Sequence, residues 1–238
     1  MSEFDKKIIV VTGASGNLGK AVVRGFLNER GIVCGVYYRQ PPEEELVEMT
    51  GGRGTFYSFT GVDLTDREGV KKLADQIRND IGVVEAVINT VGGFMMGERV
   101  DQMKSETWNQ MLSVNVNTML NSAAAFVPMM VELQRGKFIT IGSRSASTGG
   151  AKTGAYAAAK SAVLRLTESM AAELKSSGIQ ANCVLPGTID TPENREAMPN
   201  ADFAKWVTPE QIAEVILFLA SPNADAITGA GIPVSGRS

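Results

Sequence analysis

The chain contains a tyrosine and a lysine at a spacing that suits proton transfer. Tyr156 and Lys160 are four residues apart, so on a helix both side chains lie on one face, about 6 Å apart along the axis. A tyrosine with an ordinary pKa of about 10 is a poor acid or base at neutral pH, and a neighbouring ammonium favours the phenolate and lowers that pKa. Ser143, which follows a predicted strand, is able to donate a hydrogen bond to a carbonyl oxygen held beside the tyrosine hydroxyl.

The composition narrows the groups that are able to do this chemistry. The 238 residues include no histidine, which excludes a Ser-His-Asp hydrolase, a histidine-ligated zinc site and a histidine acid/base pair. Proton transfer therefore falls to Tyr, Lys, Asp, Glu or Cys. Cys34 and Cys183 lie inside apolar runs, so we expect buried thiols and neither a disulfide framework nor a metal site.

Charge and hydropathy indicate the surroundings in which the protein works. The 23 Lys and Arg residues and 26 Asp and Glu residues leave a net charge of −3, which offers no basic field for nucleic acid or an acidic membrane surface. No secretory signal appears at residues 1–7, and no apolar run approaches the roughly 20 residues that span a bilayer. We expect a soluble, cytoplasmic protein that binds neither nucleic acid nor membrane.

A glycine-rich turn lies near the start of the chain. Gly13, Gly16 and Gly19 separate an apolar run from a stretch with helical periodicity. Glycine permits positive φ angles and a close approach of the backbone to a ligand. The helix that follows points its free N–H groups and the positive end of its dipole at the turn. This context predicts a binding site for the pyrophosphate of a dinucleotide.

The end of the second predicted strand bears on which dinucleotide binds. An Asp or Glu about 20 residues after the glycines would accept hydrogen bonds from the adenosine ribose and favour NAD. The strand instead ends Val36-Tyr37-Tyr38-Arg39, with no acid. Arg39 is able to pair with a 2′-phosphate and to stack on adenine. The sequence therefore favours NADP(H) over NAD(H).

Short apolar runs alternate with helix-like stretches along the whole chain. The predicted strands are residues 7–12, 32–38, part of 55–64, 85–90, 137–142, 180–185 and 232–234. The predicted helices are residues 20–30, 43–49, 66–81, 105–133 with a kink near Pro128, 153–177 and 208–221. This alternation predicts an α/β fold, a Rossmann-like doubly wound sheet of about seven parallel strands with helices on both faces. No linker interrupts it, so we expect residues 1–238 to form one domain.

Residues 192–206 form the one long stretch without clear periodicity. The segment is rich in Pro and polar residues, so it is expected either to be a flexible surface loop or to cover a substrate pocket. Apolar candidates for the mouth of such a pocket lie here and after the fourth predicted strand, and each is equally suited to ordinary packing. They are Phe94, Met95, Met96, Met198, Phe203 and Trp206.

Together these motifs resemble the short-chain dehydrogenase/reductase family, over residues 7–236. The resemblance is carried by Thr12-Gly13-Ala14-Ser15-Gly16-Asn17-Leu18-Gly19, Val62-Asp63-Leu64, Asn89-Thr90-Val91-Gly92, Asn115, Ser143, Tyr156-Ala157-Ala158-Ala159-Lys160 and Pro186-Gly187-Thr188. It implies an NADP(H)-dependent carbonyl reductase or alcohol dehydrogenase, acting on a small-molecule carbonyl compound such as a 3-oxoacyl thioester or another ketone. It also implies pairing into a homodimer or homotetramer through the helices around residues 111–131 and 155–174.

The resemblance also implies a role for each matching residue. Ser143 would polarise the substrate carbonyl and Tyr156 would transfer the proton. Lys160 would lower the tyrosine pKa and bind the nicotinamide ribose, and Asn115 would hold a water of the proton relay. Asp63 would meet the adenine, Asn89 and Gly92 the adenosine ribose, and Thr188 and Ile189 the carboxamide and phosphates. The complete expected cofactor set is Gly13, Ser15, Gly16, Asn17, Leu18, Gly19, Arg39, Asp63, Leu64, Asn89, Gly92, Tyr156, Lys160, Pro186, Gly187, Thr188 and Ile189.

Two departures from the family pattern leave alternatives open. Asn17 stands where the middle glycine is usual, with Gly16 before it, and Thr90-Val91 replaces the usual Asn-Ala. Residues 190–206 resemble dihydropteridine reductases, which share the shifted glycine but usually lack a serine at the place of Ser143. Reduction of a quinonoid pterin is therefore the alternative chemistry. A catalytically silent NADP(H) sensor is the alternative from another class, although the presence of all four catalytic residues argues against it.

Overall fold

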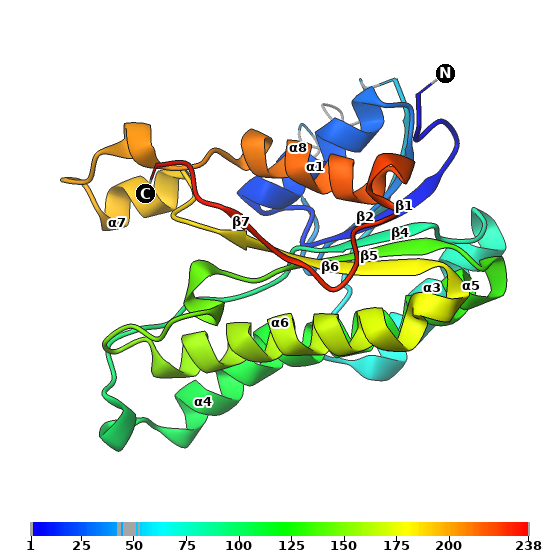
Figure 1. The fold of residues 1–238 in the computed structure, drawn as a ribbon. Helices are drawn as coiled ribbons and strands as arrows, with labels where there is room; N and C mark the ends of the chain where they lie inside the picture. Colours follow the sequence, from blue (N-terminus) through cyan, green and yellow to red (C-terminus); the bar gives the residue numbers. More distant parts are fainter. Residues whose placement is uncertain (1, 42–43, 45–50, 52, 238) are drawn as a thin grey trace.

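The computed structural model describes residues 2–41, 44, 51 and 53–237, and its centre is a seven-stranded sheet (Figure 1). The strands are β1 (Ile8–Thr12), β2 (Ile32–Val36), β3 (Thr55–Phe59), β4 (Ala86–Asn89), β5 (Gly136–Ile141), β6 (Ile179–Pro186) and β7 (Gly231–Val234). They lie in the order β3-β2-β1-β4-β5-β6-β7, and every neighbouring pair is parallel. The predicted α/β class and parallel sheet are confirmed.

The central strands β1, β4 and β5 are buried at every position and mainly apolar, because both faces of the sheet are covered. All five residues of β1 are buried, with Ile9 and Val11 in one core and Ile8 and Val10 in the other. Successive strand residues point to opposite faces, so a strand buried on both sides gains from apolar side chains throughout. Cys34 is buried within β2, as expected.

Helices pack on both faces of this sheet (Figure 1). One face carries α1 (Asn17–Asn28) and α8 (Pro209–Ala220). The other carries α3 (Arg67–Asp80), α4 (Ser105–Leu112), α5 (Thr118–Leu133) and α6 (Gly154–Leu174). None of the helices in the described part of the chain is long and apolar enough to cross a membrane.

Several helix ends follow the signals in the sequence. The side chain of Asp66 accepts a hydrogen bond from the Glu68 amide at 3.1 Å and caps α3. Thr208 and Gln211 form a reciprocal capping box at the start of α8, with distances of 3.2 and 3.0 Å. Gly178 follows α6 and a short 3₁₀ turn with φ of 69°, a left-handed conformation that suits glycine.

The prediction of one continuous α-helix over residues 105–133 is wrong in one turn. A π-helical turn, Ser113–Asn117, separates α4 from α5. Pro128 lies inside α5 and does not end it. The predicted helix 43–49 falls, apart from residue 44, outside the described residues.

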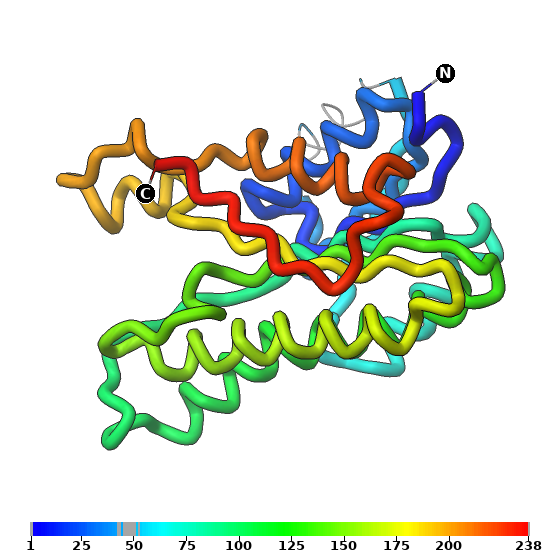
Figure 2. The backbone as a smooth tube through the Cα atoms, in the orientation of Figure 1, coloured from blue at the N-terminus to red at the C-terminus, as the bar shows by residue number. Residues whose placement is uncertain are grey.

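Residues 192–206 contain secondary structure that their composition did not predict. Pro192–Ala197 forms helix α7, and Phe203–Lys205 forms a 3₁₀ turn. The end of the chain returns to this segment (Figure 2), where Arg237 donates from its amide to the Lys205 carbonyl at 2.9 Å and from its guanidinium to the Ala204 carbonyl at 3.0 Å. The segment is therefore held at both its α7 end and its 3₁₀ end.

Candidate active site

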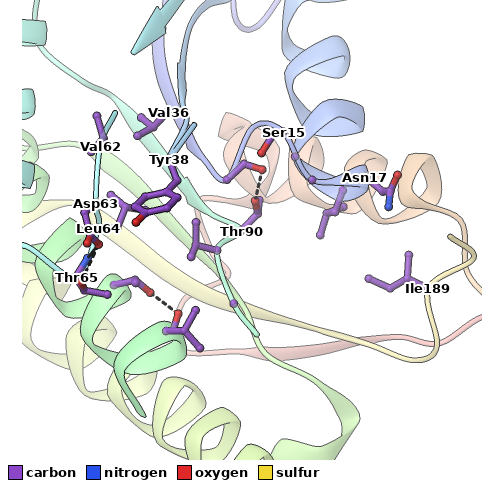
Figure 3. Close-up of a pocket in the computed structure, with 18 of the residues that line it drawn as sticks. Ser15, Asn17, Val36, Tyr38, Val62, Asp63, Leu64, Thr65, Thr90 and Ile189 are labelled. Carbon is purple, nitrogen blue, oxygen red and sulfur yellow. Dashed lines mark hydrogen bonds between the residues drawn. The ribbon is translucent and has the colours of Figure 1, made fainter. Parts of the chain in front are cut away.

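A cavity of about 780 Å³ opens at the carboxyl ends of β1 and β4 (Figure 3). Here the sheet order reverses, because β2 lies on one side of β1 and β4 on the other, and ligands of open α/β sheets bind at such a switch point. Predicted cofactor residues contribute much of the lining: Gly13, Ser15, Gly16, Asn17, Leu18, Gly19, Asp63, Leu64, Gly92 and Ile189.

The glycine turn has the geometry that a pyrophosphate needs. Gly13 has φ of 66°, and a Cβ on Gly19 would lie 2.1 Å from the Gly13 carbonyl oxygen, so neither position tolerates a side chain without a shift. Gly16 precedes α1, and no side chain in the described part of the chain caps the amides of the first helical turn. These amides are free to bind an anion. The turn fits a dinucleotide phosphate.

Asn17, the departure from the family pattern, connects the turn to α7. Its Nδ2 donates to Glu193 Oε2 at 2.9 Å, and Glu193 lies in the first turn of α7. Thr191 accepts a hydrogen bond from the Asn194 amide at 3.2 Å and caps α7. Asn17 therefore ties the beginning of α1 to the segment that follows Ile189.

Two residues of the expected cofactor set, Arg39 after β2 and Asn89 on β4, do not line the cavity. Tyr38, 65 % exposed, lines the cavity, whereas Arg39 is exposed and does not line it. Asn89 is buried and its Oδ1 accepts from Thr12 Oγ1 at 3.3 Å, so it joins two strands and does not line the cavity. Asp63 does line it, and accepts from the Thr65 amide and hydroxyl at 2.8 and 2.7 Å (Figure 3).

A second cavity, of about 450 Å³, adjoins the first and holds the predicted catalytic residues. The two share Leu18, Thr90, Gly92 and Ile189 in their linings. The second is lined by Ser143, Tyr156 and Lys160, and by the predicted cofactor residues Pro186, Gly187 and Thr188. Two elements supply these three groups, because Ser143 follows β5 and the other two lie on the first turns of α6.

Burial sets the protonation of Tyr156 in this structure. Desolvation raises the pKa of its hydroxyl, and a hydrogen bond with Ser143 opposes that shift. The Lys160 ammonium lies 5.9 Å from the centre of the tyrosine ring. In the protein alone desolvation is the larger effect on the tyrosine pKa, and the lowering of that pKa by Lys160 stays a prediction.

Lys160 is almost completely buried beside the tyrosine. Its Nζ donates to the Ile141 carbonyl oxygen at 2.9 Å. Burial lowers the pKa of this ammonium to about 8, and the nearby Cys183 thiol partly opposes the shift. The buried Cys183 thus lies behind the candidate catalytic lysine.

Asn115 lies in the π-helical turn and faces Gly92 and Gly93. Its Nδ2 donates to the carbonyls of Met111 and Gly93 at 3.0 and 3.1 Å, and its Oδ1 accepts from the Gly93 amide at 3.2 Å. A Cβ on Gly92 would lie 2.8 Å from Asn115 Oδ1 and 2.9 Å from Lys160 Nζ. The structure thereby brings Asn115 close to Lys160, on either side of Gly92, where an added Cβ would require these side chains to shift.

The mouth of the second cavity is lined by some of the apolar candidates and not by others. Phe94 and Met198 line it. Met95 and Met96 line a separate small cavity of about 50 Å³. Phe203 and Trp206 stack on each other at 4.8 Å between ring centroids, and neither lines these three cavities.

The lining residues that the sequence analysis missed as site residues include Thr90, Tyr38 and Arg144. Thr90 lines both cavities and donates from its hydroxyl to the Thr12 carbonyl at 2.6 Å. Of Tyr38 the sequence analysis noted only that it is not an Asp or Glu. Arg144 lines the second cavity, and its position directly after Ser143 was the signal that could have identified it.

Comparisons with known proteins agree with this architecture. A family model described as short chain dehydrogenase matches residues 7–202, so the chain belongs to the short-chain dehydrogenase/reductase family. It is accordingly an oxidoreductase that acts on CH–OH groups, and an NAD(P) cofactor is typical of this family.

Individual relatives are similar over nearly the whole chain. The 3-oxoacyl-[acyl-carrier-protein] reductase FabG of Vibrio cholerae is 30% identical, covering 98% of this chain and 97% of its own. The uncharacterized oxidoreductase YxbG of Bacillus subtilis is 28% identical, covering 99% and 92%. A solved short-chain type dehydrogenase/reductase from Mycobacterium ulcerans superposes with a TM-score of 0.91 at 26% identity, covering 100% and 90%. The narrower resemblance to dihydropteridine reductases is not supported by these matches.

Proposed function

We propose that this enzyme uses NADP(H) to interconvert a carbonyl and a secondary alcohol, with Tyr156 as the acid/base. The observation that carries the proposal is the meeting of two cavities, one built by the glycine turn and the other by Ser143, Tyr156 and Lys160. A 3-oxoacyl thioester or another ketone is the substrate class to test first, because similar proteins carry the name 3-oxoacyl-[acyl-carrier-protein] reductase.

Each catalytic side chain has a role that its contacts support. The Ser143 Oγ accepts from the Ser145 amide at 3.1 Å and is hydrogen-bonded with Tyr156, so a substrate carbonyl oxygen placed beside the tyrosine hydroxyl would accept the serine proton. Tyr156, whose pKa is raised by burial, remains protonated at neutral pH and gives its proton to the same oxygen during reduction. Lys160 and Asn115 lie behind it and return a proton through solvent. The cofactor, when bound, supplies or accepts the hydride.

NADP(H) is the proposed cofactor because no acid follows β2. The positions after the strand are Tyr37, Tyr38 and Arg39, and the last is exposed beside the cavity lining. We expect NADPH to bind at least about tenfold more tightly than NADH, a difference of about 1.4 kcal/mol, and Arg39→Ala to reduce that ratio. Equal affinities for the two cofactors in the parent protein would contradict this preference.

The test of the proposed reaction is a substrate panel with a matched variant. Ketones, 3-oxoacyl thioesters, quinones and pterins are offered with NADPH, and its oxidation is followed by absorbance. Tyr156→Phe removes the hydroxyl and keeps the ring, so NADPH binding should survive while turnover falls by about 10² or more. A Phe variant that reduces carbonyl substrates at a near-normal rate would refute Tyr156 as the acid.

We also infer that the chain forms a single domain and a homo-oligomer, and that residues 192–206 cover the substrate pocket. Leu120 on α5 is 43 % exposed, which supports pairing through the helices around residues 111–131 and 155–174 in a homodimer or homotetramer. A sedimentation profile with only a 25.3 kDa species at micromolar protein would count against the oligomer.

Residues 192–206 follow Thr188 and Ile189, which line the second cavity, so their position supports the covering role.

A further inference from the structure

Two large apolar side chains are exposed at the second cavity. Phe94 and Met198 line it, and they are 59 % and 40 % exposed. Leu18 and Ile141 line the same cavity but are buried in the core of the protein. Large apolar side chains left exposed beside a reactive group indicate an apolar portion of the ligand.

The Phe94 ring lies against the ring of Tyr156. The two ring centroids are 4.8 Å apart, and the ring planes meet at 86°. The tyrosine ring carries the hydroxyl that is proposed to transfer the proton. A group attached to a carbonyl carbon at that hydroxyl therefore comes within reach of Phe94, and more than half of the Phe94 surface is exposed to receive it.

The loop that carries Phe94 is held by two neighbouring helices. The Gly97 amide donates to the Lys152 carbonyl at 2.9 Å, which ties the loop to the residues before α6. Glu98 accepts from the Thr107 hydroxyl of α4 at 3.1 Å. An aromatic ring on a loop that is already held loses little conformational freedom when a ligand packs on it.

Met198 directly follows α7, which is held by its own contacts. The Met198 amide donates to the Asn194 carbonyl at 3.0 Å. Arg195 of α7 pairs with both carboxylate oxygens of Asp190, and its guanidinium lies 5.0 Å from the centroid of the Phe203 ring. The thioether at the cavity is therefore placed by α7 and the aromatic ring by the loop after β4.

These two side chains favour an aromatic group over an aliphatic one. Aromatic rings attract one another in offset and edge-to-face arrangements, in addition to the gain from buried apolar area. A thioether sulfur also interacts favourably with the edge of an aromatic ring. Phe94 and Met198 supply one partner of each kind to the same cavity. An aliphatic group would gain from apolar area alone.

We propose that the substrate is a carbonyl compound with an aromatic ring, and that Phe94 is the residue that selects it. The carbonyl oxygen lies at Ser143 and Tyr156, and the aromatic ring packs on Phe94 with Met198 at its edge. This inference rests on the proposed carbonyl chemistry and adds the kind of group that the carbonyl carries.

The test compares three ketones with NADPH: benzylacetone, the same ketone with cyclohexyl in place of phenyl, and butanone. In both ring ketones two methylene groups separate the ring from the carbonyl, so the carbonyls are equally reactive. The cyclohexyl ketone is the more hydrophobic of the two, and a pocket that selects only apolar area would prefer it. In the parent enzyme kcat/KM should instead be about threefold to tenfold higher for the phenyl ketone, and lowest for butanone. Equal or reversed values for the two ring ketones would overturn the inference.

Variants separate selection by the Phe94 ring from its contact with Tyr156. Phe94→Leu keeps an apolar side chain and removes the ring, so the preference for the phenyl ketone should disappear, whereas Phe94→Tyr should keep it. A disturbed Tyr156 would slow all ketones alike and would leave the ratio of the two ring ketones unchanged. Val100→Ala changes an exposed apolar residue that does not line the cavity, so it should leave this ratio unchanged. A ratio that survives Phe94→Leu, or that Val100→Ala also removes, would overturn the inference.

Binding of the corresponding alcohols distinguishes this inference from the proposed function. Calorimetry of the two ring alcohols with NADPH present needs no turnover, because cofactor and ligand are both reduced. If neither ketone is reduced but the phenyl alcohol binds more tightly in a Phe94-dependent way, the proposed reaction fails and the aromatic site stands. Equal binding of the two alcohols would refute the aromatic site, whatever the enzyme reduces.

A titration with NADPH alone tests whether the cofactor is the partner of Phe94. Because the proposed partner is the substrate, Phe94→Leu should leave NADPH affinity within about threefold of the parent value. A larger loss would identify the nicotinamide ring as the group that packs on Phe94 and would overturn the inference.

Discussion

The buried ammonium of Lys160 should make the stability of this protein rise with pH. Its pKa is lowered from 10.5 to about 8, because burial disfavours the charged form in the folded state. Below about pH 8 the lysine is protonated in both the folded and the unfolded state, and the full cost of the buried charge is present. Between about pH 8 and 10.5 the unfolded state binds more protons than the folded state, so the free energy of unfolding increases.

The magnitude of this effect follows from the displacement of the pKa. A change from 10.5 to about 8 corresponds to a total of about 3.4 kcal/mol over the whole range. Between pH 7 and pH 9 the expected gain is about 1.3 kcal/mol. The Cys34 and Cys183 thiols, whose pKa values burial raises, act in the opposite direction at high pH, since the unfolded thiols lose their protons first.

The assay is a difference measurement between the parent protein and a variant without the ammonium. Parent protein and Lys160→Met are unfolded in urea at pH 7, 8 and 9 at one protein concentration, with tryptophan fluorescence as the signal. Lys160→Met leaves the Ile141 carbonyl without its lysine donor at every pH, so this loss adds a constant to the difference between the proteins. The parent should gain about 1.3 kcal/mol relative to the variant from pH 7 to pH 9. Parallel stability curves would refute the buried-ammonium explanation.

Three further expectations concern the turn, a helix cap and the covering segment. Gly19→Ala places a Cβ 2.1 Å from the Gly13 carbonyl oxygen, so it should lower the free energy of unfolding by about 1–3 kcal/mol and weaken NADPH binding. Gly16→Ala places its Cβ 3.5 Å from the same oxygen and should cost little. Equal melting temperatures of the two variants would contradict this. Thr208→Ala should lower the free energy of unfolding by about 1 kcal/mol and Thr208→Ser should restore it, as chemical denaturation will show. Amide exchange in residues 192–206 should slow when cofactor and substrate are both bound, and Trp206→Ala should raise KM while NADPH affinity stays within about threefold. Exchange that is equally slow with and without ligands would identify a fixed loop.

The strands and most helices could be predicted because residues within or directly beside each element determine it. A strand buried on both faces is a contiguous apolar run, which is why residues 7–12 and 137–142 correspond to β1 and β5 within one residue at each end. Helix starts at Asp66 and Thr208 follow from side chains that cap their own backbone. Nothing distant in the chain has to be known for these elements.

The π-helical turn depends on a distant contact and was not predicted. Asn115 bonds Met111 within its own helix and Gly93 after β4. The periodicity of residues 105–133 describes which face is buried and carries no information on such a bond. The structure still brings Ser143, Tyr156 and Lys160 to one cavity, because the spacing of Tyr156 and Lys160 on α6 survives any change in the surrounding loops. Their catalytic roles stay a prediction.

Helix α7 was missed although its signal was present. Thr191-Pro192 repeats the arrangement of Thr208-Pro209, a capping threonine followed by a proline in the first turn. Because the rest of the segment is rich in polar residues and lacks periodicity, this helix of six residues was not predicted. Arg39 is exposed and lies outside the cavity lining of the protein alone, so its role at a 2′-phosphate stays a prediction.

The hydrogen bond between Asn17 and Glu193 has a consequence for protein engineering. The proposed covering role makes residues 192–206 the segment to graft from a relative when the substrate range is to be altered. A graft without an acceptor at position 193 would leave the amide of Asn17 without its partner, and a glycine at position 17 would leave Glu193 without its donor. The two positions are 176 residues apart in the chain, yet a functional chimaera has to exchange them as a pair.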